Sequence, residues 1–272
     1  MNAAAPQLSA PHTPVISRLR VTFPRVMTSE WIKLRSLRSS WYTLGAAVAA
    51  MVLLGALIGY TLGHKWSTFT PADHAASAPL DGYQLAQLLI GVLGALFVTG
   101  EYATGMIRST FAAVPKRLPV LGAKATVFAG VSLLTMTVAS FGAFYASQAF
   151  LSHYDHATSL THPGVLRAVI GTGVYLTLIG LLGSALGWIL RTTAGAIATL
   201  VGILLIGPVI FEAIGKSANS IAEYMPAKAG VSFITTIHAS ETLQPWTGLL
   251  VLCTWVALAL ITASYLVCAR DA

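Results

Sequence analysis

Residues 100–124, GEYATGMIRSTFAAVPKRLPVLGAK, form a polar and basic stretch between two apolar runs that are each long enough to cross a bilayer. If the residues after Gly100 are helical, one helix face carries Glu101, Thr104, Gly105 and Arg108. Their spacing of i, i+3, i+4 and i+7 is that of neighbours on one face of a helix. The other face carries Ala103, Met106, Ile107, Phe111 and Val114. We therefore expect a short amphipathic helix at the membrane surface that ends at Pro115 and turns its polar face outward.

The composition around this stretch indicates an integral membrane protein. The chain has 272 residues, of which 56% are hydrophobic and only 9% are charged, whereas about 25% of the residues of a soluble domain are charged. Six apolar runs approach the roughly 20 residues that cross a bilayer, and they are 43–63, 83–99, 125–150, 168–190, 194–214 and 246–267. The predicted fold class is all-α, a polytopic membrane protein with six transmembrane helices.

The basic residues predict the orientation of these spans. With the N-terminus inside, most of the 16 Lys and Arg residues fall on the cytoplasmic side, as the positive-inside rule requires. The external segments then hold only Lys65, Arg167, Lys216 and Lys228. We expect both termini and residues 100–124 in the cytoplasm, and we interpret the net charge of +7 as affinity for anionic lipid headgroups rather than for nucleic acid.

The N-terminal part divides into a tail and a helix. Residues 1–24 are rich in Pro, Ala, Ser and Thr, and we expect a flexible cytoplasmic tail. Residues 25–41 carry a helical apolar stripe, and tryptophans near both ends with basic residues between them are typical of an interfacial helix. The residues expected to contact lipid are Trp31, Lys33, Arg35, Arg38 and Trp41. A simple anchor and a mechanical role both stay open, since anchoring needs the same residues.

Small residues within the spans predict close helix packing. They include Gly55, Gly59, Gly173, Gly180 and Gly187, and such residues let helices approach closely in lipid. Packing within one bundle is favoured over a dimer interface, because a six-span bundle needs many such contacts. The external residues 215–245 are too apolar for a plain loop, so we expect short helices on the outer membrane surface, or a partial re-entry, broken at Met225-Pro226 and Gly230.

Several kinds of chemistry are missing from the sequence. It has no G-x-x-x-x-G-K-[ST], G-x-G-x-x-G, C-x-x-C or H-E-x-x-H motif. No charged residue falls near the middle of a predicted span, which disfavours a proton-coupled carrier or a charged pore; Glu212 comes nearest and is expected to extend to the outer interface. His153, Asp155 and His156 are possible metal ligands, but we interpret them as solvated loop residues, so neither a metal site nor a catalytic residue is predicted.

Four stretches, in this order along the chain, resemble the permease subunits of type-2 ABC exporters from actinobacteria. They are Ser29-Glu30-Trp31 with residues 33–39; Gly100-Glu101-Tyr102 with Thr104-Gly105, Ile107-Arg108, residues 112–117 and Ala123-Lys124; Met225-Pro226 with Ala229-Gly230; and Trp246 and Gly248 with residues 270–272. The resemblance covers nearly all of the chain from residue 25 onward. Ala103 and Met106 depart from the family's pattern.

This resemblance implies the type-2 ABC exporter transmembrane fold over residues 25–272, in a bacterial plasma membrane. It implies a permease that is not an enzyme and binds no cofactor, paired with a second permease copy or a related permease. Two separate ATPase subunits, which bind ATP and Mg²⁺, would dock beneath the pair. Residues 100–124 would be the coupling helix and residues 25–41 the connecting helix, and closure of the ATPases would switch the pathway from inward-open to outward-open.

We therefore expect Glu101, Thr104, Gly105 and Arg108 to transmit the motion of the ATPase, with Glu101 and Arg108 pairing with charged ATPase residues. The two charges could equally serve only to complement the helix dipole, which is worth about 0.3–1 kcal/mol each. The main alternative function is a non-transporting scaffold or regulator that docks another cytoplasmic protein. A secondary carrier or channel and a membrane enzyme are disfavoured by the missing charges and motifs.

Overall fold

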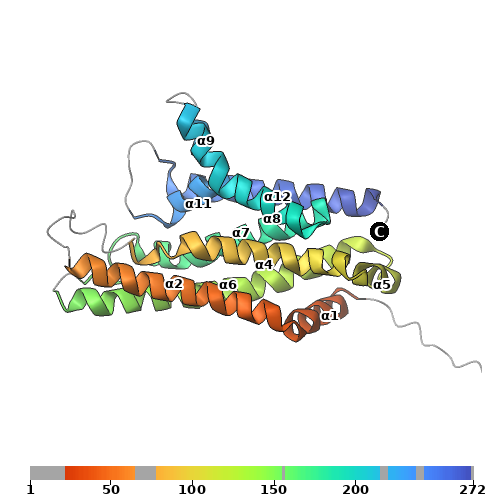
Figure 1. Ribbon diagram of the computed structural model, residues 1–272, viewed down its shortest axis with the longest axis horizontal. Helices are drawn as coiled ribbons and strands as arrows, with labels where there is room; N and C mark the ends of the chain where they lie inside the picture. The colour runs from red at the N-terminus through yellow and green to blue at the C-terminus, as the bar shows by residue number, and fades with distance from the viewer. Residues whose placement is uncertain (1–21, 65–77, 155–156, 215–219, 237–241, 271–272) are drawn as a thin grey trace, which may run out of the picture.

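The structure of the chain is a computed structural model, which describes residues 22–64, 78–154, 157–214, 220–236 and 242–270. Throughout these residues every regular element is helical, and the long helices lie side by side along one axis (Figure 1). The elements are α1 (Phe23–Ser36), α2 (Arg38–His64), η2 (Ala78–Leu80), α4 (Tyr83–Ala103), α5 (Met106–Ala113), α6 (Arg117–Ser152), α7 (Val165–Leu190), α8 (Thr193–Val201), η3 (Gly202–Ile206), α9 (Gly207–Ile214), α11 (Pro226–Ile234) and α12 (Pro245–Ala269).

Six helical segments are long and apolar enough to cross a membrane. They are α2, α4, α6, α7, the continuous segment α8–η3–α9, and α12. Each contains one of the six predicted runs, so the prediction of an all-α polytopic membrane protein is confirmed at this level. The main difference is that α6 begins at Arg117, inside the stretch expected to be polar and separate.

The segments that the charge pattern places on one side of a membrane lie together in space. The helices α1 and α5 and the C-terminal end of α12 lie at one end of the bundle, which we call the α5 end (Figure 1). Helix α11 lies toward the opposite end. Helix α1 begins at Phe23, so the predicted tail 1–24 is two residues too long, and Pro24 fits the first turn because no N–H is needed there. Residues 1–21 lie outside the described residues.

Glycines bring the backbones of α4 and α7 into direct contact. A Cβ added at Gly94 would lie 2.0 Å from the carbonyl oxygen of Gly180, and one added at Gly183 would lie 2.1 Å from the carbonyl oxygen of Gly91. Real Cβ atoms do not approach backbone oxygen so closely, so only glycine permits this crossing. The predicted packing glycines include Gly180 but not Gly91, Gly94 or Gly183, since the sequence does not show which glycines of two helices meet.

The five glycines predicted to pack helices all face another helix of the same chain. Gly55 and Gly59 face α6 near Ala143 and Ser147, and Gly173 faces Thr137 of the same helix. Gly180 also meets Phe128 of α6, while Gly187 lies against Ala95 and Val98 of α4. Packing between helices of one bundle therefore explains why these five positions are glycine.

The external segment is partly built into the bundle. Helix α11 begins at Pro226, as the predicted break there requires, but it continues through Gly230, where a break was also predicted. Helix α11 packs against α7 and α12. The guanidinium of Arg167 donates hydrogen bonds to the carbonyl oxygens of Phe233 and Thr235, so it satisfies the end of α11. Helix α11 is therefore packed into the bundle, and its placement on the outer membrane surface or as a partial re-entry stays a prediction. Residues 215–219 and 237–241 lie outside the described residues.

The fifth span is irregular and loosely packed in the half that lies away from the α5 end. Its middle turn, η3, is a π-helix, and Pro208 follows at the second residue of α9. Within α9, Pro208 is the single buried residue. Helix α9 diverges from the other helices in Figure 1. Glu212, expected to extend to the outer interface, forms an ion pair of 2.5 Å with Lys228 of α11, and both side chains are about half exposed.

The α4–α7 crossing predicts the effect of a single methyl group. Gly183→Ala should lower the free energy of unfolding by about 1–3 kcal/mol, because the backbones must move apart to admit the Cβ. The measurement is the midpoint of thermal unfolding of the purified protein in detergent. Gly130→Ala is the matched control, since nothing lies within 4 Å of a Cβ at Gly130, and it should not lower the midpoint. Equal midpoints for the two variants would contradict the crossing.

Candidate functional site

Four charged side chains meet inside the α5 end of the bundle. Glu30 and Lys33 belong to α1, Glu101 to the last turn of α4 and Lys124 to α6. The ammonium of Lys124 lies 2.7 Å from a carboxylate oxygen of Glu30 and 2.8 Å from Oε1 of Glu101. The ammonium of Lys33 lies 2.7 Å from Glu30 and 3.0 Å from the same Glu101 oxygen. We call these four residues the charge cluster.

The charge cluster is almost dry and carries no net charge. The side chains of Glu30 and Lys124 are each 1% exposed, that of Glu101 is 7% exposed, and that of Lys33 is 18% exposed. Removing such groups from water costs several kcal/mol per ion, so each charge needs its partners. Lys124 gains two more contacts, a hydrogen bond of 3.2 Å to the Phe97 carbonyl oxygen and a cation–π contact 4.1 Å from the Phe97 ring centre.

The partners also set the protonation of Lys33. Burial lowers the pKa of the Lys33 ammonium, but the hydrogen bonds and charges of Glu30 and Glu101 outweigh burial, and the pKa lies above its ordinary value. Lys33 is therefore charged throughout the physiological pH range. Its spacing from Glu30, i and i+3 on α1, holds both side chains on the same helix face.

Helix α5 is attached to the bundle by two buried residues and one hydrogen bond. Ile107 and Phe111 are buried, and the Phe111 ring stacks on Trp188 with centroids 6.4 Å apart. The Lys33 ammonium donates a hydrogen bond of 3.2 Å to Oγ1 of Thr110. Helix α5 thus contacts the charge cluster directly, through the same ammonium that pairs with both carboxylates.

The expectation of one helix running through residues 101–108 is wrong. Helix α4 continues to Ala103, and Gly105 has the left-handed conformation, with φ of 72°, before α5 begins at Met106. A left-handed glycine is a common helix terminator, because it lacks the Cβ that disfavours positive φ. Glu101 and Arg108 therefore lie on different helices and do not share a polar face.

The predicted coupling residues separate into one buried and three exposed positions. Glu101 is buried in the charge cluster, whereas Thr104, Gly105 and Arg108 are exposed. The exposed residues around them form what we call the α5 surface: Thr104, Gly105, Arg108, Ser109, Ala112 and Ala113. The apolar side of α5 packs on the bundle through Ile107 and Phe111 rather than facing lipid, while Ala103 and Met106, predicted on that side, are exposed.

The predicted interfacial helix 25–41 is also two helices. Leu37 is extended, with φ of −82° and ψ of 101°, so Arg38 and Trp41 belong to α2. The indole of Trp41 donates a hydrogen bond of 3.1 Å to the Arg35 carbonyl oxygen and so satisfies the end of α1. Trp31, Arg35, Arg38 and Trp41 are exposed, as an interfacial role requires, but Lys33 points into the charge cluster.

Two basic residues at this end, expected only to orient the chain, satisfy helix ends. Arg117 donates hydrogen bonds to the carbonyl oxygens of Val267 and Arg270, at 2.9 and 2.7 Å. Arg270 donates one of 3.2 Å to the carbonyl oxygen of Ile189. Cations near the C-terminal ends of helices also complement the helix dipole, so these residues tie together α6, α7 and α12.

Sequence reasoning missed Glu30 and Lys124 as parts of the site. The available signal was Lys124, a charged residue that directly precedes a long apolar run. An ionisable residue at membrane depth needs a partner, so Lys124 called for an acidic residue nearby. Within the described ranges, no group of three or more His, Cys, Asp and Glu side chains could hold a metal ion. Asp155 and His156 lie outside the described residues.

Comparison of the chain with models of protein families and with curated proteins found no match.

The charge cluster predicts a large effect of removing one charge and a small effect of removing a pair. Lys124→Met should lower the free energy of unfolding by about 3–5 kcal/mol, because two carboxylates then stay buried with one ammonium. Adding Glu101→Gln restores neutrality and should recover most of that loss. Thermal unfolding in detergent measures both effects. Lys116→Met, at an exposed position of the same end, is the control and should change little; additive losses in the double variant would contradict a coupled cluster.

Proposed function

We propose that the chain is the transmembrane permease subunit of an ATP-driven ABC exporter. It would form the substrate pathway with a second permease copy and dock separate ATPase subunits that bind ATP and Mg²⁺. Both termini and the α5 end would face the cytoplasm of a bacterial cell. The order of the motifs along the sequence, the six apolar helices and the lack of a phosphate-binding loop support this proposal.

The observation that carries the proposal is an exposed helix tied to the buried charge cluster. The α5 surface presents small residues and one cation, Arg108, to whatever lies beyond the end of the bundle. The opposite side of α5 is fixed by Ile107, Phe111 and the Thr110–Lys33 hydrogen bond. A partner that pushes on α5 therefore pushes on the bundle, and small side chains allow that partner to approach closely.

The charge cluster would carry such a push to three other helices. Lys33 joins α5 to α1, and its carboxylate partners join α1 to α4 and to α6 through Lys124. Moving one member away alone would leave a buried charge unpaired, at a cost of about 3–5 kcal/mol. The α5 ends of these helices would therefore move together, as a rigid-body transition requires.

This arrangement changes the role that we propose for Glu101. Its Oε1 pairs with Lys33 and Lys124 of the same chain rather than with a basic ATPase residue. We assign it to internal transmission, while Thr104, Gly105 and Arg108 stay as proposed contacts with the ATPase. The alternative that the two charges only complement a helix dipole is wrong, because Arg108 lies in the first turn of α5 and Glu101 in the last turn of α4, where each sign opposes the dipole.

Reversing the charge of Arg108 tests the docking. Arg108→Glu should weaken binding of the proposed partner ATPase by about tenfold or more, since arginines at interface centres are frequent hot spots. Co-purification from membranes and permease-stimulated ATP hydrolysis in proteoliposomes measure the effect. Arg35→Glu, the same change at an exposed position of α1, is the matched control. If no ATPase binds the unaltered chain, the scaffold alternative replaces the exporter.

A milder substitution tests the transmission separately from docking. Thr110→Val keeps the shape of the side chain but removes the acceptor for Lys33. ATPase binding should be unchanged, while the stimulation of ATP hydrolysis by the permease should fall about two- to tenfold, the equivalent of one hydrogen bond of roughly 0.5–1.5 kcal/mol. Thr28→Val, the same change at an exposed position of α1 outside the α5 surface and the charge cluster, is the control. Unchanged stimulation in Thr110→Val would contradict this route of transmission.

A further inference from the structure

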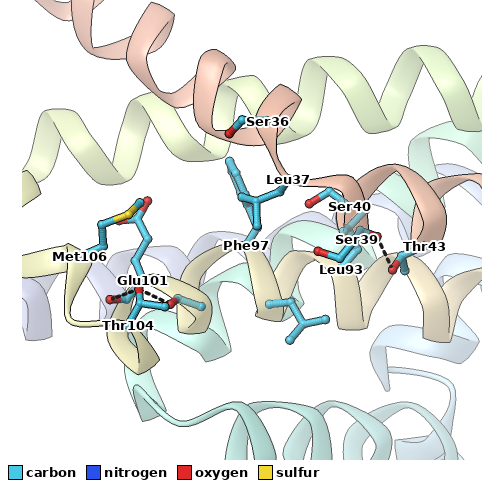
Figure 2. A pocket seen from close by; sticks show the side chains of 12 residues that line it. Ser36, Leu37, Ser39, Ser40, Thr43, Leu93, Phe97, Glu101, Thr104 and Met106 are labelled. Carbon is cyan, nitrogen blue, oxygen red and sulfur yellow. Dashed lines mark hydrogen bonds between the residues drawn. The ribbon is translucent and has the colours of Figure 1, made fainter.

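A pocket of about 330 Å³ lies between the junction of α1 and α2, the last turns of α4 and the start of α5 (Figure 2). Side-chain hydroxyls line one part of it, from Ser36, Ser39, Ser40, Thr43 and Thr104. Leucines and Phe97 line most of the remainder. The pocket thus combines a polar rim with an apolar wall, at the end of two membrane-crossing helices.

The first feature that points to a ligand is an unused carboxylate oxygen. Glu101 lines the pocket, and its side chain is drawn among the lining residues in Figure 2. Its Oε1 accepts from Lys33 and Lys124, but its Oε2 is buried and has no hydrogen-bond partner within the described part of the chain. A buried carboxylate oxygen without a donor is unfavourable, so this position calls for an N–H or O–H group from outside the chain.

The second feature is the N-terminal end of α2. The helix begins at Arg38, and Ser39 and Ser40 of its first turn line the pocket. The first N–H groups of a helix have no acceptor within the helix, and the helix dipole places partial positive charge there. Phosphate groups bind at such helix ends. The hydroxyls of Ser36, Thr43 and Thr104 already donate to backbone carbonyl oxygens, so the hydroxyls of Ser39 and Ser40 are the ones proposed to donate further hydrogen bonds.

We infer that this pocket binds the phosphoethanolamine headgroup of a membrane lipid. The phosphate lies at the first turn of α2 beside the hydroxyls of Ser39 and Ser40, and the primary ammonium donates a hydrogen bond to Oε2 of Glu101. This headgroup carries both charges, so it adds no net charge beside the neutral charge cluster. The acyl chains leave past Leu37 and Leu96, which are 46% and 39% exposed at the pocket.

The position of the pocket fits a lipid of the surrounding bilayer. Headgroups lie at the ends of membrane-crossing helices, where tryptophan is also favoured. Trp31 and Trp41 are exposed on the two helices that meet beside the pocket. The inference rests on the pocket alone and does not depend on the proposed export function.

Methylation of the ammonium provides the sharpest test, because it removes N–H donors while the charge stays. Native mass spectrometry of the full chain in detergent would compare phosphatidylethanolamine, its mono- and dimethyl derivatives and phosphatidylcholine, all with the same acyl chains. Phosphatidylethanolamine should be retained about tenfold more than phosphatidylcholine, the equivalent of one hydrogen bond to a charged group. Equal retention, or stronger retention of phosphatidylglycerol than of phosphatidylethanolamine, would overturn the inference.

Filling the pocket locates the site without disturbing the charge cluster. Leu96→Trp places a larger side chain in the pocket at a partly exposed position and should abolish the preference for the primary ammonium. Leu85→Trp is the matched control, because Leu85 lies on the same helix, is 51% exposed and lines a different pocket. The preference should persist in this control. If Leu96→Trp also keeps the preference, the lipid binds elsewhere and the assignment fails.

Discussion

The requirement that buried charges be paired organises the α5 end of this protein. Glu30, Lys33, Glu101 and Lys124 come from three helices and neutralise one another almost without water. Such clusters contribute little net stability relative to apolar packing, but they penalise incomplete arrangements strongly. The cluster therefore fixes where α1 meets α4 and α6, and it holds α5 through Thr110. The short helix that protrudes from the bundle is thus connected to its interior.

The rest of the bundle divides into a tight half and a loose half. Glycine contacts bring α4 and α7 together at backbone distance, and similar contacts join α2 and α7 to α6. Packing of this kind leaves few alternative arrangements. The segment η3–α9 has a π-helical turn and a proline, and its buried residues are Leu204 in η3 and Pro208 in α9. Rearrangement of the bundle is therefore easier in η3 and α9 than at the α4–α7 crossing.

Much of the fold could be predicted from the sequence, because the bilayer requires long apolar helices and the sequence shows them directly. The helix ends could not, since the break at Gly105 depends on one backbone conformation and the spacing of Glu101 and Arg108 fits an unbroken helix equally well. The charge cluster was missed for a different reason. Hydropathy and helical periodicity describe each segment alone, whereas Lys33 and Glu101 are 68 residues apart and meet only through tertiary packing. The exposed positions Thr104, Gly105 and Arg108 were accessible to local reasoning.

The order of the charges along the chain also has a consequence for synthesis. Chains emerge from the ribosome N-terminal end first, so Glu30 and Lys33 appear long before their other two partners. Glu101 arrives with the second span, and Lys124 arrives only with the third. Until then two carboxylates would share a single ammonium, and burying them would be unfavourable. Helix α1, although it is made first, therefore reaches its final place only after the third span has been inserted.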